Sequence, residues 1–325
     1  MTPFERALRE RIGTDGPITV EAYMDACNRY YYATRDPLGV RGDFTTAPEI
    51  SQIFGELIGA CLAHCWGRAG KPQDVAYVEL GPGRGTLAAD ALRVMKSAGL
   101  EPSVHFVETS PVLRAAQAET VPGAIGYEEF ADVPDGPLLV IANEFLDALP
   151  IRQFVGAMER RVVVAGGGLA FDRDGEIVEA SPAREEAVTG IAKRLVKCDG
   201  VAVLIDYGHA KTAPGDTLQA VRGHKFAPVL ADPGEQDLTA HVDFEAIARA
   251  AREAGAAVTD VVAQGEWLKR LGIDARAQSL ARAHPKRADE IETARNRLCD
   301  ADQMGDLFKV IAVHSPDWPQ PVGFQ

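Results

Sequence analysis

A glycine-rich turn between an apolar run and an amphipathic segment restricts the fold of this chain more than any other feature. The turn reads GPGRG at 81–85, with a predicted strand at 75–80 before it and a predicted helix at 87–98 after it. Glycines let a chain reverse sharply and let a ligand approach the backbone where no Cβ intervenes. The N-terminus of the helix then offers free N–H donors. We therefore expect this turn to bind a small polar molecule.

Short apolar runs alternate with helical segments from residue 74 onward. Beyond the turn, further strands are predicted at 104–108, 138–142, 201–206 and 308–314, and a helix at 111–119. Strands that alternate with helices form βαβ units, in which right-handed crossovers make neighbouring strands parallel. The pattern predicts an α/β fold with a mostly parallel sheet.

Several stretches depart from this alternation. Residues 1–70 are expected to form an N-terminal helical region with a lid loop, and residues 71–325 the core. Within the core, 151–199 is predicted to insert antiparallel hairpins, appended to the sheet, and a helix, because β-type runs there are separated by glycines. Residues 265–306 are rich in alanine and charge and are predicted to form a helical cap.

Composition restricts the class of partner. The chain has 34 Lys and Arg residues against 47 Asp and Glu, a formal net charge of −13. Nucleic-acid binding depends on concentrated basic residues, so we expect a basic partner or a small molecule instead. No apolar stretch approaches the roughly 20 residues of a membrane span, and the first residues lack the core of a signal peptide, so no membrane insertion is expected. Five scattered cysteines favour a reducing, cytoplasmic setting.

The spacing of the glycines separates the candidate ligands. Dinucleotide-binding turns read G-x-G-x-x-G, but Thr86 stands where their third glycine would be. The G-K-[ST] ending of a triphosphate-binding loop is also missing. Glu79, at the end of the predicted strand, would repel a pyrophosphate and suits a ligand with an ammonium group. These features favour S-adenosylmethionine as the cofactor. Its expected contacts are Glu79, Gly81, Pro82, Gly83 and Gly85.

Acidic and amide side chains follow the next strands. Glu108 ends a strand about 20 residues after Gly85, the spacing of an acid that accepts both hydroxyls of a ribose. The alternative is a surface carboxylate that caps the following helix. Asn143 and Glu144 end another strand, where open α/β sheets bind ligands. Glu144, with Asp147 nearby, is expected to orient a guanidinium through bidentate bonds. The alternative is a set of first-turn acids that stabilise a helix.

Three further groups of residues have a functional and a structural interpretation. Thr46 and Glu49 lie in a loop before a helix, and either cap that helix or form part of a lid over the cofactor. His241 either deprotonates the acceptor or is a buried structural histidine. Cys61 and Cys65, with a histidine between them, are interpreted as buried thiols, and no metal site is predicted.

Five motifs, in order, resemble the MidA-type family of S-adenosylmethionine-dependent methyltransferases. They read GDFTTAPEISQIFGE (42–56), VELGPGRGTL (78–87), NEFLDALP (143–150), IDYGH (205–209) and PGEQDLTAHVDF (233–244). Eukaryotic members of this family are mitochondrial assembly factors of respiratory complex I. The resemblance implies a class I methyltransferase core that methylates arginine in a complex I subunit. It places the three glycines at the cofactor, Glu108 at the ribose and Asn143-Glu144 at the reaction.

The sequence therefore predicts a protein arginine methyltransferase in which Glu144 orients the guanidinium. For a bacterial member the expected location is the cytoplasm, and a homodimer is a possible assembly. Three alternatives stay open at this stage: a methyltransferase for a small molecule, an NAD-linked oxidoreductase, and an assembly chaperone that binds S-adenosylmethionine without catalysis. Thr86 and Glu79 disfavour the oxidoreductase.

Overall fold

A mostly parallel sheet forms the centre of the molecule. The computed structural model describes residues 1–39 and 42–324. The strand order is β4-β3-β2-β5-β11-β18-β16, with β15 paired to β11 and β17 to β18. Neighbours from β4 to β11 are parallel, and β18 is antiparallel to β11. The bounds are β2 (Ala76–Leu80), β3 (Ser103–Val107), β4 (Ile125–Tyr127), β5 (Leu138–Asn143), β11 (Gly200–His209), β15 (Val242–Asp243), β16 (Ala257–Val258), β17 (Val262–Ala263) and β18 (Phe308–His314). The predicted α/β class is confirmed.

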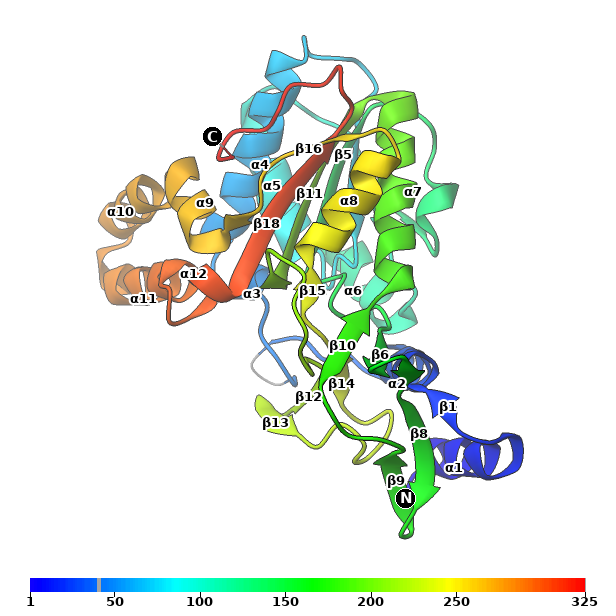
Figure 1. Cartoon of the computed structure of the whole chain (residues 1–325). Helices are drawn as coiled ribbons and strands as arrows, with labels where there is room; N and C mark the ends of the chain where they lie inside the picture. Colours follow the sequence, from blue (N-terminus) through cyan, green and yellow to red (C-terminus); the bar gives the residue numbers. More distant parts are fainter. Residues whose placement is uncertain (40–41, 325) are drawn as a thin grey trace.

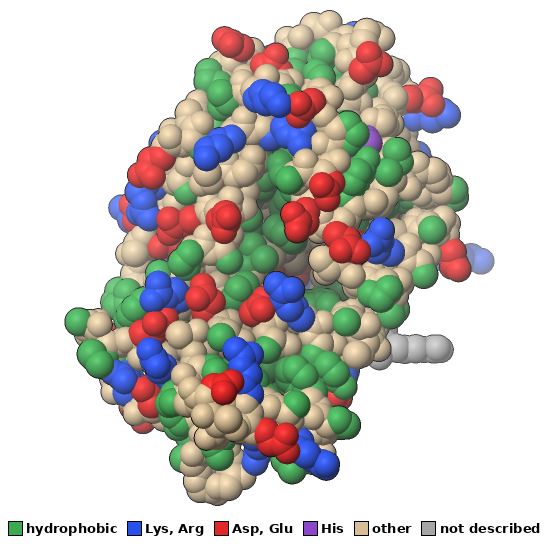
Figure 2. All heavy atoms as spheres, turned by 90° about the vertical axis from the view of Figure 1, so that its right-hand side faces the viewer, with side chains coloured by type: hydrophobic (Ala, Val, Ile, Leu, Met, Phe, Trp, Pro, Cys, Tyr) green, Lys and Arg blue, Asp and Glu red, His purple; other side chains and the backbone are tan. Residues whose placement is uncertain are grey.

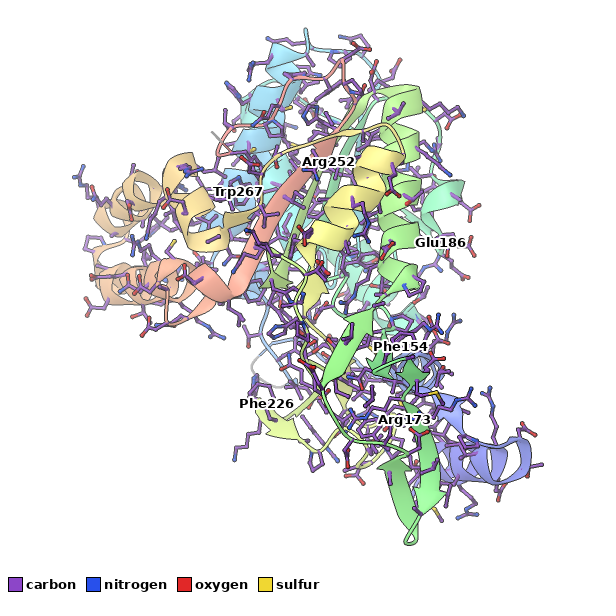
Figure 3. The ribbon with its side chains drawn as sticks, viewed as in Figure 1. Phe154, Arg173, Glu186, Phe226, Arg252 and Trp267 are labelled. Carbon is purple, nitrogen blue, oxygen red and sulfur yellow. The ribbon has the colours of Figure 1, made fainter. Side chains whose placement is uncertain are left out.

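Helices cover both faces of this sheet (Figure 1). On one face, α4 (Gln52–Arg68), α5 (Thr86–Ser97) and α9 (Gln264–Leu271) contribute to a single apolar cluster. On the other, α7 (Pro182–Cys198) and α8 (Phe244–Glu253) pack on a second cluster. Strand residues alternate between the clusters, with Tyr77 in the first and Val78 in the second. The outer faces of these helices are polar, and Glu186 and Arg252 point away from the sheet (Figure 3).

The strand order places a crevice at one edge of the sheet. The chain runs from β2 outward through β3 and β4, and then returns to place β5 and β11 on the other side of β2. In the register, Leu80 lies beside Val107 on one side and Ala142 on the other. Three strands thus end at one level, and ligands bind outside the carboxyl ends of strands where the order reverses.

The predicted hairpins do not extend this sheet, so their expected attachment to it was wrong. They belong to a separate lobe at the lower end of Figure 1, built from three small sheets ordered β1-β8-β9, β10-β6-β7 and β13-β12-β14. Ile18 pairs with Val162, and both are buried with α1 and α2 in a third apolar cluster. The elements are α1 (Pro3–Asp15), β1 (Ile18–Thr19), α2 (Val20–Thr34), β6 (Arg152–Val155), β7 (Met158–Glu159), β8 (Arg161–Ala165), β9 (Gly168–Phe171), β10 (Ile177–Ala180), β12 (Gln219–Arg222), β13 (Lys225–Ala227) and β14 (Asp237–Thr239).

Local capping explains where the N-terminal helices begin. The Thr19 hydroxyl accepts the Ala22 N–H at 3.1 Å, as predicted for the start of α2. The helical stretch after Thr46 consists of two helices, α3 (Ala47–Ile50) and α4, separated by Ser51 in an extended conformation. The Ser51 hydroxyl accepts the Ile53 N–H and starts α4 afresh.

The helical segment at 265–306 lies beside α4, away from the lobe (Figure 1). Arg276 of this segment and Arg93 of α5 both donate to the buried Glu56 carboxylate, which fastens the cap to the core. The segment contains α9, α10 (Ile273–Ala283), η2 (Pro285–Arg287), α11 (Ala288–Cys299) and α12 (Met304–Leu307). Among the described residues, none of the helices has the length and apolar character needed to cross a membrane.

A buried arginine of α7 joins the core to the lobe. The Arg184 guanidinium donates to the carbonyl oxygens of Leu146 at 2.7 Å, Asp147 at 2.9 Å, Ala240 at 2.9 Å and His241 at 2.6 Å. The first two acceptors follow β5, and the other two follow β14 of the lobe. One side chain thus supplies donors to four carbonyls in irregular segments, and two of them, those of Leu146 and Asp147, also accept a backbone N–H.

Replacement of this arginine should therefore destabilise the whole protein. We expect Arg184→Met to lower the free energy of unfolding, measured by urea denaturation, by about 3 kcal/mol or more, because buried carbonyls lose their donors. The matched control is Lys197→Met on the same helix, since Lys197 is exposed and pairs with Asp135 at the surface. Equal losses in the two variants would contradict this role of Arg184.

Candidate functional site

A cavity of about 680 Å³ lies at the carboxyl ends of β2, β3 and β5. The glycine turn, the residues after β3 and the residues after β5 form one side of it, and α2 and the loop before α3 form much of the other. Figure 2 shows that the face bearing α7 and α2 is hollowed between the upper part and the lobe below it. Of the predicted residues, the cavity brings together Thr46, Glu49, Glu79, Gly81, Pro82, Gly83, Glu108, Asn143 and Glu144.

The three glycines of the turn all have left-handed backbone conformations. Their φ angles are 62° at Gly81, 54° at Gly83 and 82° at Gly85, and L side chains rarely adopt such values. A Cβ at Gly81 would lie 3.1 Å from Phe145, and one at Gly83 would lie 2.8 Å from Leu38. The first two glycines thus keep the cavity open along the backbone. Gly85 lies behind the cavity wall and turns the chain into α5.

Glu79 is a buried carboxylate at the end of β2. Its Oε2 accepts the Tyr77 hydroxyl at 2.6 Å. Burial raises the pKa of Glu79 to about 8, because the charged form loses water and gains no cation in return. A positively charged ligand group in the cavity would therefore be stabilised by this carboxylate.

Glu108 combines the two interpretations that the sequence left open. Its Oε1 accepts the Ser110 N–H at 2.8 Å, so it orders the turn before α6 (Pro111–Thr120). The helix cap itself is Ser110, whose hydroxyl accepts the Leu113 N–H. Burial raises the pKa of Glu108, and the side chain lines the cavity. The carboxylate is thus fixed by its own turn while it remains available to a ligand.

Glu144 has the most unusual geometry at the site. Its φ of 51° lies in the left-handed region, which a non-glycine residue adopts only when its surroundings enforce it. Its N–H donates to the Ile205 carbonyl at 2.9 Å, which holds this turn against β11. Its Oε1 accepts the Ala47 N–H at 3.1 Å and the Asn143 amide at 3.3 Å. Burial and the charge of Asp147 raise the pKa of Glu144 to about 8.

The loop before α3 is fastened to the glycine turn. Arg84 of the turn donates to Asp36 at 2.8 Å and to the Leu38 carbonyl at 2.7 Å. Glu49 of α3 accepts the Thr86 hydroxyl at 2.6 Å. The Thr46 side chain makes no capping hydrogen bond to α3, so the structure does not show the capping alternative. The N–H of Ala47, the first residue of α3, is bound by Glu144. Residues 40 and 41 of the predicted lid loop lie outside the described residues.

Asp147 and His241 are not placed on the cavity lining. The N–H groups of Leu146 and Asp147 both donate to Asp206 Oδ2, at 3.0 and 3.1 Å. This turns the chain so that the Asp147 side chain lies among Asp206, Tyr207 and Arg184, behind the wall. His241 is half-buried with its ring edge-on to Tyr207, and burial lowers its pKa.

Sequence reasoning missed most of the apolar and aromatic lining. Three consecutive tyrosines at 30–32 belong to α2, and the first of them, Tyr30, is stacked on Phe4 at 4.5 Å. Tyr32 instead lines the cavity. The three consecutive positions point in different directions around α2, and only the tertiary structure shows which one meets the cavity. The other missed residues include Leu38, Phe44, Phe130 and Phe145.

The paired cysteines of α4 are buried thiols, as predicted. Cys61 lies near the Val322 carbonyl at 3.7 Å, and Cys65 lies near the Pro319 carbonyl at 3.1 Å. Burial raises the pKa of Cys61 to about 12 and that of Cys65 to about 11. Both therefore serve to pack the C-terminal segment against α4.

Fold and cavity together define a class I methyltransferase. Residues 57–168 and 159–262 match the Methyltransf_28 family, described as S-adenosyl-L-methionine-dependent methyltransferases. The chain belongs to this family, and its cofactor is S-adenosylmethionine. The residues present fit that cofactor: backbone glycines line a cavity that Cβ atoms would obstruct, and Glu79 and Glu108 supply buried carboxylates for an ammonium group and a ribose.

Curated relatives and solved structures agree with this assignment. The chain is 35% identical to the mitochondrial protein arginine methyltransferase NDUFAF7 of Xenopus tropicalis, with 93% of this chain and 84% of the relative covered. It is 36% identical to the Drosophila melanogaster homologue, with 98% and 88% covered. A Burkholderia thailandensis protein described as a candidate methyl transferase, solved with S-adenosyl-homocysteine, is 26% identical with a TM-score of 0.86, over 98% of this chain and 93% of that one.

The fastened loop leads to a prediction about cofactor affinity. We expect Thr46→Ala combined with Glu49→Ala to weaken S-adenosylhomocysteine binding about tenfold, because the Thr86 hydroxyl loses its charged acceptor and the loop loses its hold on the turn. Isothermal titration calorimetry measures the affinity, and Glu266→Ala in the distant helical cap serves as the control. Unchanged affinity in a folded double variant would refute the lid function.

Proposed function

We propose that this methyltransferase acts on the guanidinium of an arginine side chain in a protein. The observation that carries the proposal is Glu144: a carboxylate on the cavity wall, fixed through Oε1, with a pKa near 8 and no adjacent cation among residues 1–39 and 42–324. A guanidinium supplies the missing positive charge and presents planar N–H donors. The names of the curated relatives, protein arginine methyltransferases, support the same acceptor.

The cofactor is assigned to the glycine side of the cavity. The backbone of Gly81, Pro82 and Gly83 would lie along it, Glu79 would face its ammonium group, and Glu108 would accept the ribose hydroxyls. When bound, S-adenosylmethionine supplies an electrophilic methyl group on a sulfonium. Residues 36–39 and 42–49, which bond both to the turn and to Glu144, would exclude water from the reacting groups.

Glu144 has two tasks in this proposal. Since the Ala47 N–H and the Asn143 amide bond to Oε1, Oε2 is the atom assigned to the guanidinium N–H. That bond holds one nitrogen toward the cofactor side of the cavity. Methylation turns a guanidinium nitrogen with two protons into one with a methyl group and one proton, and Glu144 accepts the released proton. Asp147 is assigned a positioning function, because its charge raises the pKa of Glu144.

The protein partner and the setting are further parts of this proposal. We propose a subunit of respiratory complex I, or a protein in its assembly, as the substrate, and the net charge of −13 suits an arginine-bearing target. We propose a cytoplasmic location for this chain, which the five free cysteines favour. The names of the curated relatives place those proteins in mitochondria.

Loss of the Glu144 charge should separate binding from catalysis. We expect Glu144→Gln to retain S-adenosylhomocysteine affinity in calorimetry and to lower the rate of methyl transfer from labelled S-adenosylmethionine to lysate proteins by at least ~100-fold. The control is Glu186→Gln on the outer face of α7 (Figure 3). Near-wild-type transfer by the Glu144 variant would remove this residue from the mechanism. Transfer only to small molecules, or no transfer by the wild type, would favour the alternative functions.

The raised pKa of Glu144 predicts a pH dependence. Below pH 8 the free enzyme holds this carboxyl protonated, and the acceptor guanidinium needs the ionised form. We therefore expect kcat/KM for the protein acceptor to rise with pH up to about 8 and then to level off. The profile of Glu144→Gln should lack this limb. The same limb in both proteins would assign the titration to another group.

A further inference from the structure

Asp237 is a buried acid that the proposed function leaves unused. It lies on β14, in the motif at 233–244, and is 4% exposed. Its Oδ1 accepts the hydroxyl proton of Tyr32 at 2.7 Å. Burial keeps Tyr32 neutral by raising its pKa well above the usual value, so its hydroxyl donates to Asp237. Since Tyr32 lines the cavity, its phenol oxygen is left to act as an acceptor there.

Hydrogen bonds fix Asp237 to the segment that follows Glu144. The Asn28 amide of α2 donates to the Ala148 carbonyl at 3.0 Å and to the Leu238 carbonyl at 2.7 Å. The Asn28 carbonyl oxygen accepts the Leu238 N–H at 3.2 Å. The Ala240 N–H donates to the Asp147 carbonyl at 3.1 Å. The strand bearing Asp237 therefore cannot shift independently of the wall that bears Glu144.

Within the part of the chain that the structure describes, the charges that raise the pKa of Asp237 are those of two other carboxylates. Burial, followed by the charges of Asp147 and Asp43, raises the pKa of Asp237 to about 8, and the Tyr32 bond only partly offsets this. Asp237 in turn acts on Glu144. The buried cation nearby, Arg184, bonds to four backbone carbonyls and not to these carboxylates. The titratable and charged groups that interact with Asp237 are Tyr31, Tyr32, Asp43, Glu144, Asp147 and Tyr207.

Two buried acceptor atoms near this cluster have no hydrogen-bond partner among the described residues. They are Asn143 Oδ1 and Asp147 Oδ1, on residues that are 8% and 6% exposed. An unpaired buried acceptor is destabilising, and each such atom in a native structure calls for a ligand or an ordered partner. Of the two, only Asn143 lines the cavity, and Asp147 lies behind its wall. Excess negative charge and the unpaired Asn143 acceptor on the cavity lining together describe a site for a cation with several N–H donors.

We propose that Asp237 determines acceptor specificity: it orients the Tyr32 hydroxyl so that the phenol oxygen accepts from the guanidinium, opposite Glu144. This inference rests on the proposed function and assigns Tyr32 and Asp237 to the acceptor pocket in addition to Glu144. A neutral acceptor of the same shape would leave the buried carboxylates without a counter-charge. The pocket therefore selects arginine over its neutral isostere citrulline.

The test compares two probes on the enzyme saturated with S-adenosylhomocysteine. Calorimetry measures the affinities of N-acetyl-arginine amide and N-acetyl-citrulline amide. We expect the wild type to prefer the arginine probe by at least about tenfold. Asp237→Asn and Tyr32→Phe should each reduce that preference about tenfold. The matched controls are Asp232→Asn, at an exposed acid, and Tyr30→Phe, at the stacked neighbour, and both should keep it.

The outcomes separate this inference from the proposed function. Equal preference in the wild type and in both variants, or no preference in the wild type, would overturn the inference. Arginine binding that depends on Asp237, without methyl transfer from S-adenosylmethionine, would support the pocket and refute the proposed reaction. Methyl transfer to arginine that is unchanged in Asp237→Asn would support the proposed reaction and refute the role of Asp237 in the pocket.

Thermal unfolding shows whether Asp237→Asn folds. The folded pKa of Asp237 is raised from 3.8 to about 8, so the wild type loses stability as pH rises between these values. The asparagine variant lacks this loss. Its unfolding temperature relative to the wild type should therefore increase over that range and level off above about pH 8. A difference that is constant with pH would contradict the burial of an uncompensated acid at this position.

Discussion

The hydrogen bond from the Ala47 N–H to the Glu144 carboxylate connects the parts of the site on which the protein depends. On one side, Ala47 begins α3, whose Glu49 reaches the residue that starts α5. On the other, Glu144 stands in a strained conformation directly after β5. The carboxylate that we propose to face the acceptor is therefore also the group that binds the loop before α3. A substitution at Glu144 would therefore disturb both the position of the loop and the environment of the acid, because the same oxygen atom bonds to Ala47 and to Asn143.

The parts of the site that could be predicted from the sequence are those set by local chemistry. Gly81, Gly83 and Gly85 have the left-handed angles that a reversal between strand and helix requires. Glu79, Glu108 and Glu144 stand at strand ends, and parallel strands deliver their ends to one edge. Each of these inferences needs only a few neighbouring residues and the rule that consecutive strands alternate with helices.

The parts that could not be predicted depend on contacts between distant segments. Arg84 reaches a partner 48 positions away, and Asn28 reaches one 210 positions away. Thr46 is a residue type that commonly caps helices, yet the N–H at the start of α3 is bound by a carboxylate that follows a distant strand. The hairpins at 152–171 have ordinary strand patterns, but their pairing with β1 follows from the apolar faces of α1 and α2. Periodicity identifies such elements without indicating which surface they cover.

The lobe below the sheet is assembled from three separate segments of the chain. Its apolar cluster combines residues from 8–27, from 151–162 and from 218–240. During synthesis, α1 and α2 emerge first, but the partners that bury them appear only from position 151 onward, and the last of them at position 240. The apolar faces of these two helices therefore stay partly exposed until the later segments have been made. A nascent chain stalled before β14 would present these faces to chaperones. The wall of the cavity that α2 supplies is thus among the last features of the protein to form.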